Sequence, residues 1–210
     1  LAKFTVAQIA AFTSTQIPAL IPDQIDALST TQIRALTTAQ IGALTDAQLD
    51  EFETDDIKAL TNAQISKMST SQIAGLSDTQ LQAFTTAQIP ALTSSQISNL
   101  APAQLAAFTT DQLKALTATQ IKALTGDQID AIGTTDFALL TSTQIAALTT
   151  SQLDTFDAGQ IAGLETSQIK GLTVAQIKSL DATQIAAIET EDLELFTAAQ
   201  IAAFTTDQVP

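Results

Sequence analysis

Residues 33–48 read IRALTTAQ followed by IGALTDAQ, and these two octets show the unit from which the whole chain is built. A large apolar residue returns at every eighth position, so that 26 copies of the octet fill residues 1–208, and Val209 and Pro210 begin another. We label the eight positions a to h, in the order I-x-A-L-T-x-x-Q. A fixed internal period outweighs the one or two globular domains that 210 residues would otherwise suggest. The sequence therefore predicts a single continuous array over residues 1–210, as a segment of a longer chain.

The composition argues against several classes of function. The net charge is −14, from 22 acidic and 8 basic residues, which is unfavourable for binding nucleic acid or an anionic membrane. No apolar run approaches the roughly 18 residues of a membrane span. The chain has no His and no Cys, and its Ser and Lys residues occupy variable, surface-type positions, so we expect no enzyme activity.

Three structures could carry a period of eight, and chain geometry separates them. In a continuous α-helix, eight residues overshoot two turns by about 80°, so the apolar stripe would wind around the helix and no single partner could cover it. In a β-solenoid, positions a and d would point to opposite faces of a strand. Ala, Leu and Gln are also poor strand formers. We therefore predict an all-α solenoid, or superhelix, of short capped helices with one helix per octet; a β-solenoid is the alternative.

Positions e and h together predict where each helix begins. Thr at e and Gln at h have the S/T-x-x-E/Q spacing of a capping box, in which each side chain bonds the backbone N–H of the other residue. The clearest predicted caps are Thr37, Gln40, Thr45, Gln48, Thr149 and Gln152. Gln at h can serve only as a cap, or it can also link adjacent coils of the solenoid, and both interpretations stay open.

Positions a and d are predicted to form the core. Six of the seven octets that have Leu at a have Phe at d, which indicates that a and d compete for the same space on one helical face. Representative core residues are Ile33, Leu36, Ile41, Leu44, Ile145 and Leu148. One octet cannot bury enough apolar surface to fold alone, so its stability must come from stacking on neighbouring copies. The number of octets in each superhelical turn stays open.

An acidic stretch, LDEFETDD at residues 49–56, offers a metal-site hypothesis, and residues 189–194 add Glu189, Glu191, Asp192 and Glu194. Its five carboxylates, which at this density could hold calcium, are Asp50, Glu51, Glu53, Asp55 and Asp56. Their spacing does not match D-x-[DN]-x-[DN]-G. An acidic surface with altered helix caps is the competing interpretation, and no other cofactor is expected.

Threonine is frequent at position f, as at Thr30, Thr38 and Thr150, and this predicts hydroxyl groups on the outside of the array. A regular hydroxyl face could bind carbohydrate, ice or a mineral surface. The competing interpretation is a small polar residue in contact with water. Positions b, f and g are all expected to face the solvent.

The octets IRALTTAQ at residues 33–40 and IAALTTSQ at residues 145–152 resemble the LTTAQI-type octapeptide arrays of very large bacterial secreted or surface proteins. The resemblance implies a structural repeat region on the bacterial cell surface or outside the cell. There it would form an extended rod or a self-assembling filament or stalk of an adhesin or biofilm-matrix protein. The partners expected are neighbouring segments of the same chain or other copies of it. The alternative function is a repetitive recognition surface for carbohydrate, ice or a partner protein.

Overall fold

The structure is a computed structural model that describes residues 1–208; Val209 and Pro210, which begin the last partial octet, lie outside the described residues. The described residues form 23 short α-helices and two 3₁₀-helices, with no β-strand among them. The all-α prediction is therefore confirmed. The chain divides into two compact units, Leu1–Ala115 and Leu116–Pro210, and each is described by itself. The continuity of a single array over residues 1–210 stays a prediction.

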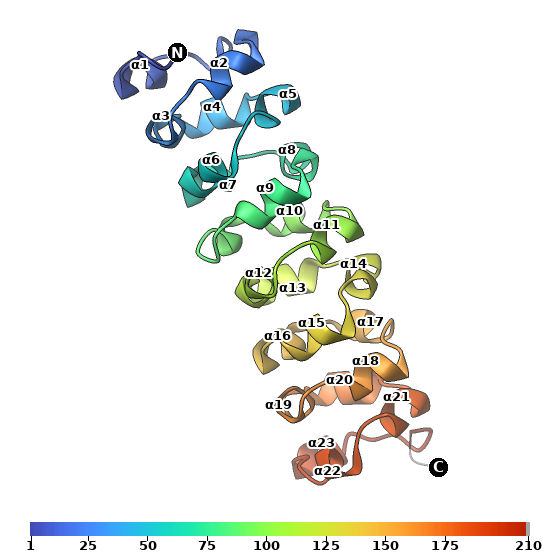
Figure 1. Cartoon of the computed structure of the whole chain (residues 1–210). Coiled ribbons are helices and arrows are strands. Elements are labelled where there is room, and N and C mark those ends of the chain that lie inside the picture. The colour runs from blue at the N-terminus through green and yellow to red at the C-terminus, as the bar shows by residue number, and fades with distance from the viewer. Residues whose placement is uncertain (209–210) are drawn as a thin grey trace. The chain divides into compact units, whose positions relative to one another are not determined.

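The helices follow one another at the octet period in both units (Figure 1). The first unit contains α1 (Val6–Ala10), η1 (Ile17–Ala19), α2 (Pro22–Asp26), α3 (Thr30–Ala35), α4 (Thr38–Gly42), α5 (Asp46–Leu49), α6 (Thr54–Ala59), α7 (Asn62–Ile65), α8 (Thr70–Gly75), α9 (Asp78–Ala83), η2 (Ile89–Ala91), α10 (Ser94–Ser98), α11 (Pro102–Ala106) and α12 (Thr110–Ala115). The second contains α13 (Ala118–Ala123), α14 (Gly126–Ala131), α15 (Thr134–Ala138), α16 (Ser142–Ala147), α17 (Thr150–Leu153), α18 (Ala158–Ala162), α19 (Thr166–Lys170), α20 (Val174–Ser179), α21 (Ala182–Ala186), α22 (Thr190–Leu193) and α23 (Ala198–Ile201).

Each helix begins after position e and ends before or near position d, because these two residues leave the helical conformation. At the start of α4, Thr37 is extended (φ −69°, ψ 160°) and Leu36 before it has φ −57° and ψ 135°. Because both residues have the ψ values of extended backbone, the chain leaves one helix here and turns toward the next. Helices of this length are not stable alone in water, so each depends on its neighbours.

Proline at position b changes the type of helix. Pro18 lies within η1 and Pro90 within η2, and these are the two octets in which the described structure has a 3₁₀-helix. A proline at this position has no N–H for the backbone bond to the residue four places earlier. Pro22 and Pro102 instead occupy the first helical position of α2 and α11, where no such bond is needed.

Three octets make one coil of the solenoid. In the first unit α3 packs on α1, α6 on α3 and α9 on α6, each three octets further along the chain (Figure 1). In the second unit α16 packs on α13 and α19 on α16, at the same interval. The coil length left open by the sequence is therefore three octets of eight residues, and each helix stacks on the corresponding helix of the next coil.

Positions a and d fill the interior of each unit. Ile33, Ile41 and Ile145 are 0% exposed, and Leu36, Leu44 and Leu148 are each 4% exposed. Away from its ends, each unit thus packs the three a and three d side chains of every coil into an apolar interior, which is the packing logic of a solenoid. Burial of these side chains supplies the main favourable free energy of folding.

Candidate functional site

The repeated polar feature of the fold is the glutamine at position h, which lies inside the array. Gln40, at the start of α4, is 1% exposed. Its Oε1 accepts from the backbone N–H of Thr37 at 2.6 Å, and the Thr37 hydroxyl accepts from the Gln40 N–H at 3.2 Å. Its Nε2 donates to the carbonyl oxygens of Ile9 at 2.9 Å and of Phe12 at 2.7 Å. One side chain therefore caps its own helix and bonds an earlier coil.

The same pattern recurs at the other predicted caps. Nε2 of Gln48 donates to the carbonyls of Ile17 and Leu20 at 2.8 and 2.7 Å, and Thr45 closes the capping box with Gln48. In the second unit, Gln152 donates to the carbonyls at residues 121 and 124 at 2.9 and 2.8 Å and forms a capping box with Thr149. The acceptors lie 31 and 28 residues earlier in each case, at positions a and d.

The chemistry of an amide explains why glutamine is required at position h. Each short helix leaves carbonyl groups near its end without partners in its own backbone ladder. An amide can donate to these carbonyls of one coil while it accepts an N–H in the next, whereas a carboxylate has no hydrogen to donate. Capping and coil linkage, left open by the sequence, are both present in the structure. We call each such side chain, with its N–H donor and its two carbonyl acceptors, a glutamine bridge.

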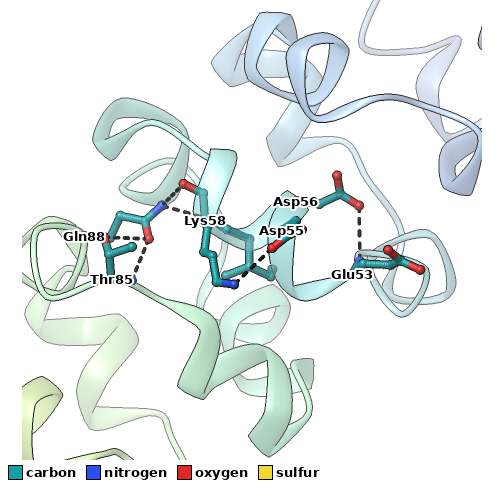
Figure 2. Close-up of polar contacts among 7 residues, drawn as sticks. Glu53, Asp55, Asp56, Lys58, Thr85 and Gln88 are labelled. Carbon is teal, nitrogen blue, oxygen red and sulfur yellow. Dashed lines mark hydrogen bonds and ion pairs between the residues drawn. The ribbon is translucent and has the colours of Figure 1, made fainter.

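Figure 2 shows a glutamine bridge beside an octet that lacks one. Nε2 of Gln88 lies 2.9 Å from the carbonyl oxygen of Ile57, 3.2 Å from that of Lys58 and 2.8 Å from that of Leu60, and Oε1 accepts from the N–H of Thr85 at 2.8 Å. These bonds join η2 to the end of α6 in the preceding coil.

The octet of α6 itself begins differently, because Asp56 occupies position h and Glu53 position e. Oδ2 of Asp56 accepts from the Glu53 N–H at 3.2 Å, which retains half of the capping box. Asp56 is 9% exposed. Burial raises the pKa of its carboxyl group above the ordinary value of 3.8, and the nearby charges of Glu53, Asp26 and Asp55 raise the pKa further, against the lowering effect of the Glu53 hydrogen bond.

The five calcium candidates do not form a common site. Asp55 pairs at the surface with Nζ of Lys58 at 3.0 Å, while Asp56 turns inward to the Glu53 N–H, so these two carboxylates point in different directions (Figure 2). Asp50 and Glu53 instead line an open surface depression of about 380 Å³. Glu51 is not among the residues that line it. Over residues 1–208, no three acidic side chains come together as metal ligands. The acidic stretch is a surface with an altered cap.

The threonines at position f are exposed, but the three-octet coil separates them into short groups. Thr30, Thr38 and Thr150 all face the solvent. Along the stacked helices α1, α3, α6 and α9, position f holds Val, Thr, Thr and Asp in turn. Along α14, α17, α20 and α23 it holds Gly, Thr, Val and Ala. Neither stack presents a long uninterrupted row of hydroxyl groups.

A second contact between coils was not predicted from the sequence, and it joins position c to position f. A Cβ atom added to Gly171 would lie 3.0 Å from Cβ of Ser142, 29 residues earlier. Conversely, a Cβ atom added to Gly126 at position f would lie 3.4 Å from Cγ2 of Thr155 at position c. This contact favours a small residue at position c where the facing f side chain lies close, as at Gly171. In the sequence, the contact would be visible as a relation between the size of the residue at position c and the size of the residue at position f, 29 residues earlier. This relation can be recognised only once the coil length is known.

Within residues 1–208, no helix combines the length and the apolar character needed to cross a lipid bilayer.

Comparison with known proteins agrees with the repeat geometry. The family model described as the ALTTAQ repeat matches the chain five times, at residues 22–52, 49–86, 99–132, 129–166 and 185–210. No curated protein matches the chain. The matched segments cover more than half of the chain and include the bridging side chains of Gln40, Gln48 and Gln152. The chain therefore belongs to the ALTTAQ repeat family.

Proposed function

We propose that this array is a structural spacer that forms an extended rod, or a self-assembling filament or stalk, of a bacterial surface or matrix protein of the adhesin type. The glutamine bridge carries the proposal. Because each coil bonds a neighbouring coil through the same buried amide, a further coil can be added without new contacts of a different kind. The length of such an array sets the distance between whatever lies at its two ends.

The repeated polar side chains form hydrogen bonds within the fold, and this supports a mechanical role rather than a catalytic one. The bridging glutamines and the capping threonines form bonds within the fold, as Gln96 does with Thr93, Ile65 and Met68. The proposal therefore assigns no catalytic step to the chain. The exposed threonines at position f are interrupted by other residue types, so recognition of carbohydrate or ice through a regular hydroxyl face is less well supported.

A location outside a bacterial cell is part of the same proposal. It is supported by the resemblance to arrays of secreted and surface proteins, and by a chain that is acidic and has no cysteine. The partners proposed are neighbouring segments of the same protein or further copies of it, since the array already bonds coil to coil through one repeated contact.

Two measurements, one in the bacterial cell and one on the purified chain, test the proposal. Immunogold electron microscopy with an antibody against the octet should place the label outside the cell, on thin projections or on extracellular matrix. Small-angle scattering of the purified 210-residue chain should give a maximum dimension well above that of a compact protein of equal mass. Label confined to the cell interior, or a compact particle in scattering, would contradict the structural role outside the cell.

A further inference from the structure

The junction between α2 and α6 is the place in the first unit where the glutamine bridge is replaced. Asp56 occupies position h, and the acceptors that a glutamine would reach from there are the carbonyls 31 and 28 residues earlier, those of Ile25 and Leu28. The bridges on either side keep this spacing: Gln48 bonds the carbonyls at residues 17 and 20, and Gln64 bonds those at residues 33 and 36.

An ionised carboxylate at this position places like charges together. It has no hydrogen with which to reach the carbonyls of Ile25 and Leu28, and carbonyl oxygens carry partial negative charge. A protonated carboxyl keeps one acceptor oxygen for the Glu53 N–H and gains one O–H donor. The neutral acid therefore has one hydrogen to donate toward these carbonyls, where the amide of Gln48 or Gln64 has two, and its side chain is one methylene shorter, so the bond requires a closer approach of the two coils.

We propose that Asp56 makes this junction a proton-gated joint, which gains a coil-to-coil hydrogen bond when Asp56 holds a proton and is looser when Asp56 is ionised. The glutamine bridges on either side do not titrate. Within the first unit, stability would then depend on pH at this one coil contact, while the glutamine bridges of that unit stay constant.

The charged groups around Asp56 favour its protonated form, as burial does. Asp26 on α2, Glu53 and Asp55 all carry negative charge, and each favours the protonated form of Asp56. Among the helices that pack against α6, α3 carries Arg34 and α9 carries Asp78, and α2 across the junction carries Asp23 as well as Asp26. Lys58 on α6 forms its ion pair with Asp55.

The sign of the effect follows from linkage. Since the folded pKa of Asp56 lies above its unfolded value, the unfolded chain loses this proton at lower pH than the folded chain does. The contribution of the joint is fully present below the unfolded value of about 3.8 and is lost as pH rises through the folded value. Above the folded pKa the loss is constant.

Replacement of Asp56 by glutamine tests the joint in the full chain. We expect Asp56→Gln to raise the midpoint of thermal unfolding at pH 7.5, and we expect this gain to be clearly smaller at pH 3.5, where the protonated Asp56 supplies one of the two bonds that glutamine makes. The control is Asp130→Gln, which removes one negative charge at an exposed position on α14 and should give no pH-dependent gain. An equal gain from Asp56→Gln at both pH values, or the same pH dependence in the control, would overturn the proposal.

An NMR titration of Asp56 in the unmodified chain tests the proposal without the Asp56→Gln variant, which could fold poorly. In the unmodified chain, the ¹³C chemical shift of the Asp56 carboxyl carbon should report a midpoint above the ordinary aspartate value of 3.8. Amides of α2 and α6 should also gain protection from hydrogen exchange, after correction for intrinsic rates, when the pH falls through that midpoint. A midpoint at or below the ordinary value would also overturn the proposal.

Discussion

The side-chain amide of Gln40 donates to the carbonyl oxygen of Ile9, 31 residues earlier, at 2.9 Å. This bond connects the first turn of α4 to the end of α1, across two successive coils of the solenoid. The Oε1 of the same amide holds the N–H of Thr37, so the start of one helix and the end of another depend on a single buried group. Helix capping and coil stacking are therefore coupled in every octet that contains such a bridge.

Loss of the donor from a bridge should destabilise the array strongly. Gln96 is 1% exposed and donates to the carbonyls of Ile65 and Met68 at 2.9 and 2.7 Å. We expect Gln96→Glu to cost about 3 kcal/mol, because two buried carbonyls lose their partner and face a carboxylate. Urea unfolding followed by circular dichroism measures this loss.

Gln8 supplies the matched control. It is exposed and forms a capping box with Thr5 at the start of α1, in the first coil, where no earlier coil among the described residues offers carbonyl groups to its amide. Gln8→Glu should change the stability by less than about 0.5 kcal/mol, because a carboxylate is favourable near a helix N-terminus. Equal losses from the two substitutions would show that glutamine acts only as a cap.

The sequence predicts the contacts inside an octet, but not the contacts between coils. Thr37 and Gln40 are three residues apart, and a helix start requires that spacing, so the cap can be read from the chain. The acceptor of Gln40 cannot be read in the same way. Every earlier octet offers the same pair of carbonyls, and coils of two, three or four octets would satisfy the pattern equally well. Only the packing of the a and d side chains in three dimensions selects three.

The two adjacent threonines of one octet should respond differently to the same change. Both threonines are exposed, but the Thr37 hydroxyl at position e accepts from the Gln40 N–H at 3.2 Å, whereas the structure shows no hydrogen bond from the Thr38 hydroxyl at position f to any described residue. We expect Thr37→Val to cost about 1 kcal/mol through loss of the cap. Thr38→Val should stay within about 0.5 kcal/mol. The difference between the thermal midpoints of the two variants measures the contribution of the cap to stability. A larger loss of stability from Thr38→Val would contradict the capping role assigned to Thr37.

Core positions should depend on their place in the array as well as on their residue type. Ile97 is 0% exposed, whereas Ile201, at the same octet position, is 49% exposed. Ile97→Ala should therefore cost about 2–5 kcal/mol. Ile201→Ala should cost under about 1 kcal/mol, since it removes little buried surface. Urea unfolding of the two variants checks the prediction, and similar losses would contradict the coil packing described for the first unit.

The contact between positions c and f gives opposite expectations for two glycines at position c. A Cβ atom on Gly75, in α8, would meet nothing within 4 Å, whereas one on Gly171 would lie 3.0 Å from Cβ of Ser142. Gly75→Ala should stabilise the chain by about 0.4–1 kcal/mol, because alanine restricts the unfolded state and favours the helix. Gly171→Ala should destabilise it by about 1 kcal/mol through overpacking.

The double variant Gly171→Ala with Ser142→Gly separates this contact from any other effect of the alanine. Removal of the Ser142 side chain opens the space that the new methyl group needs, so the double variant should be more stable than the two separate changes predict. Thermal unfolding of the single and double variants gives the coupling energy. If the effects of the two substitutions are additive, the Ser142 side chain does not require a small residue at position 171. The contact between positions c and f would then not explain the glycine.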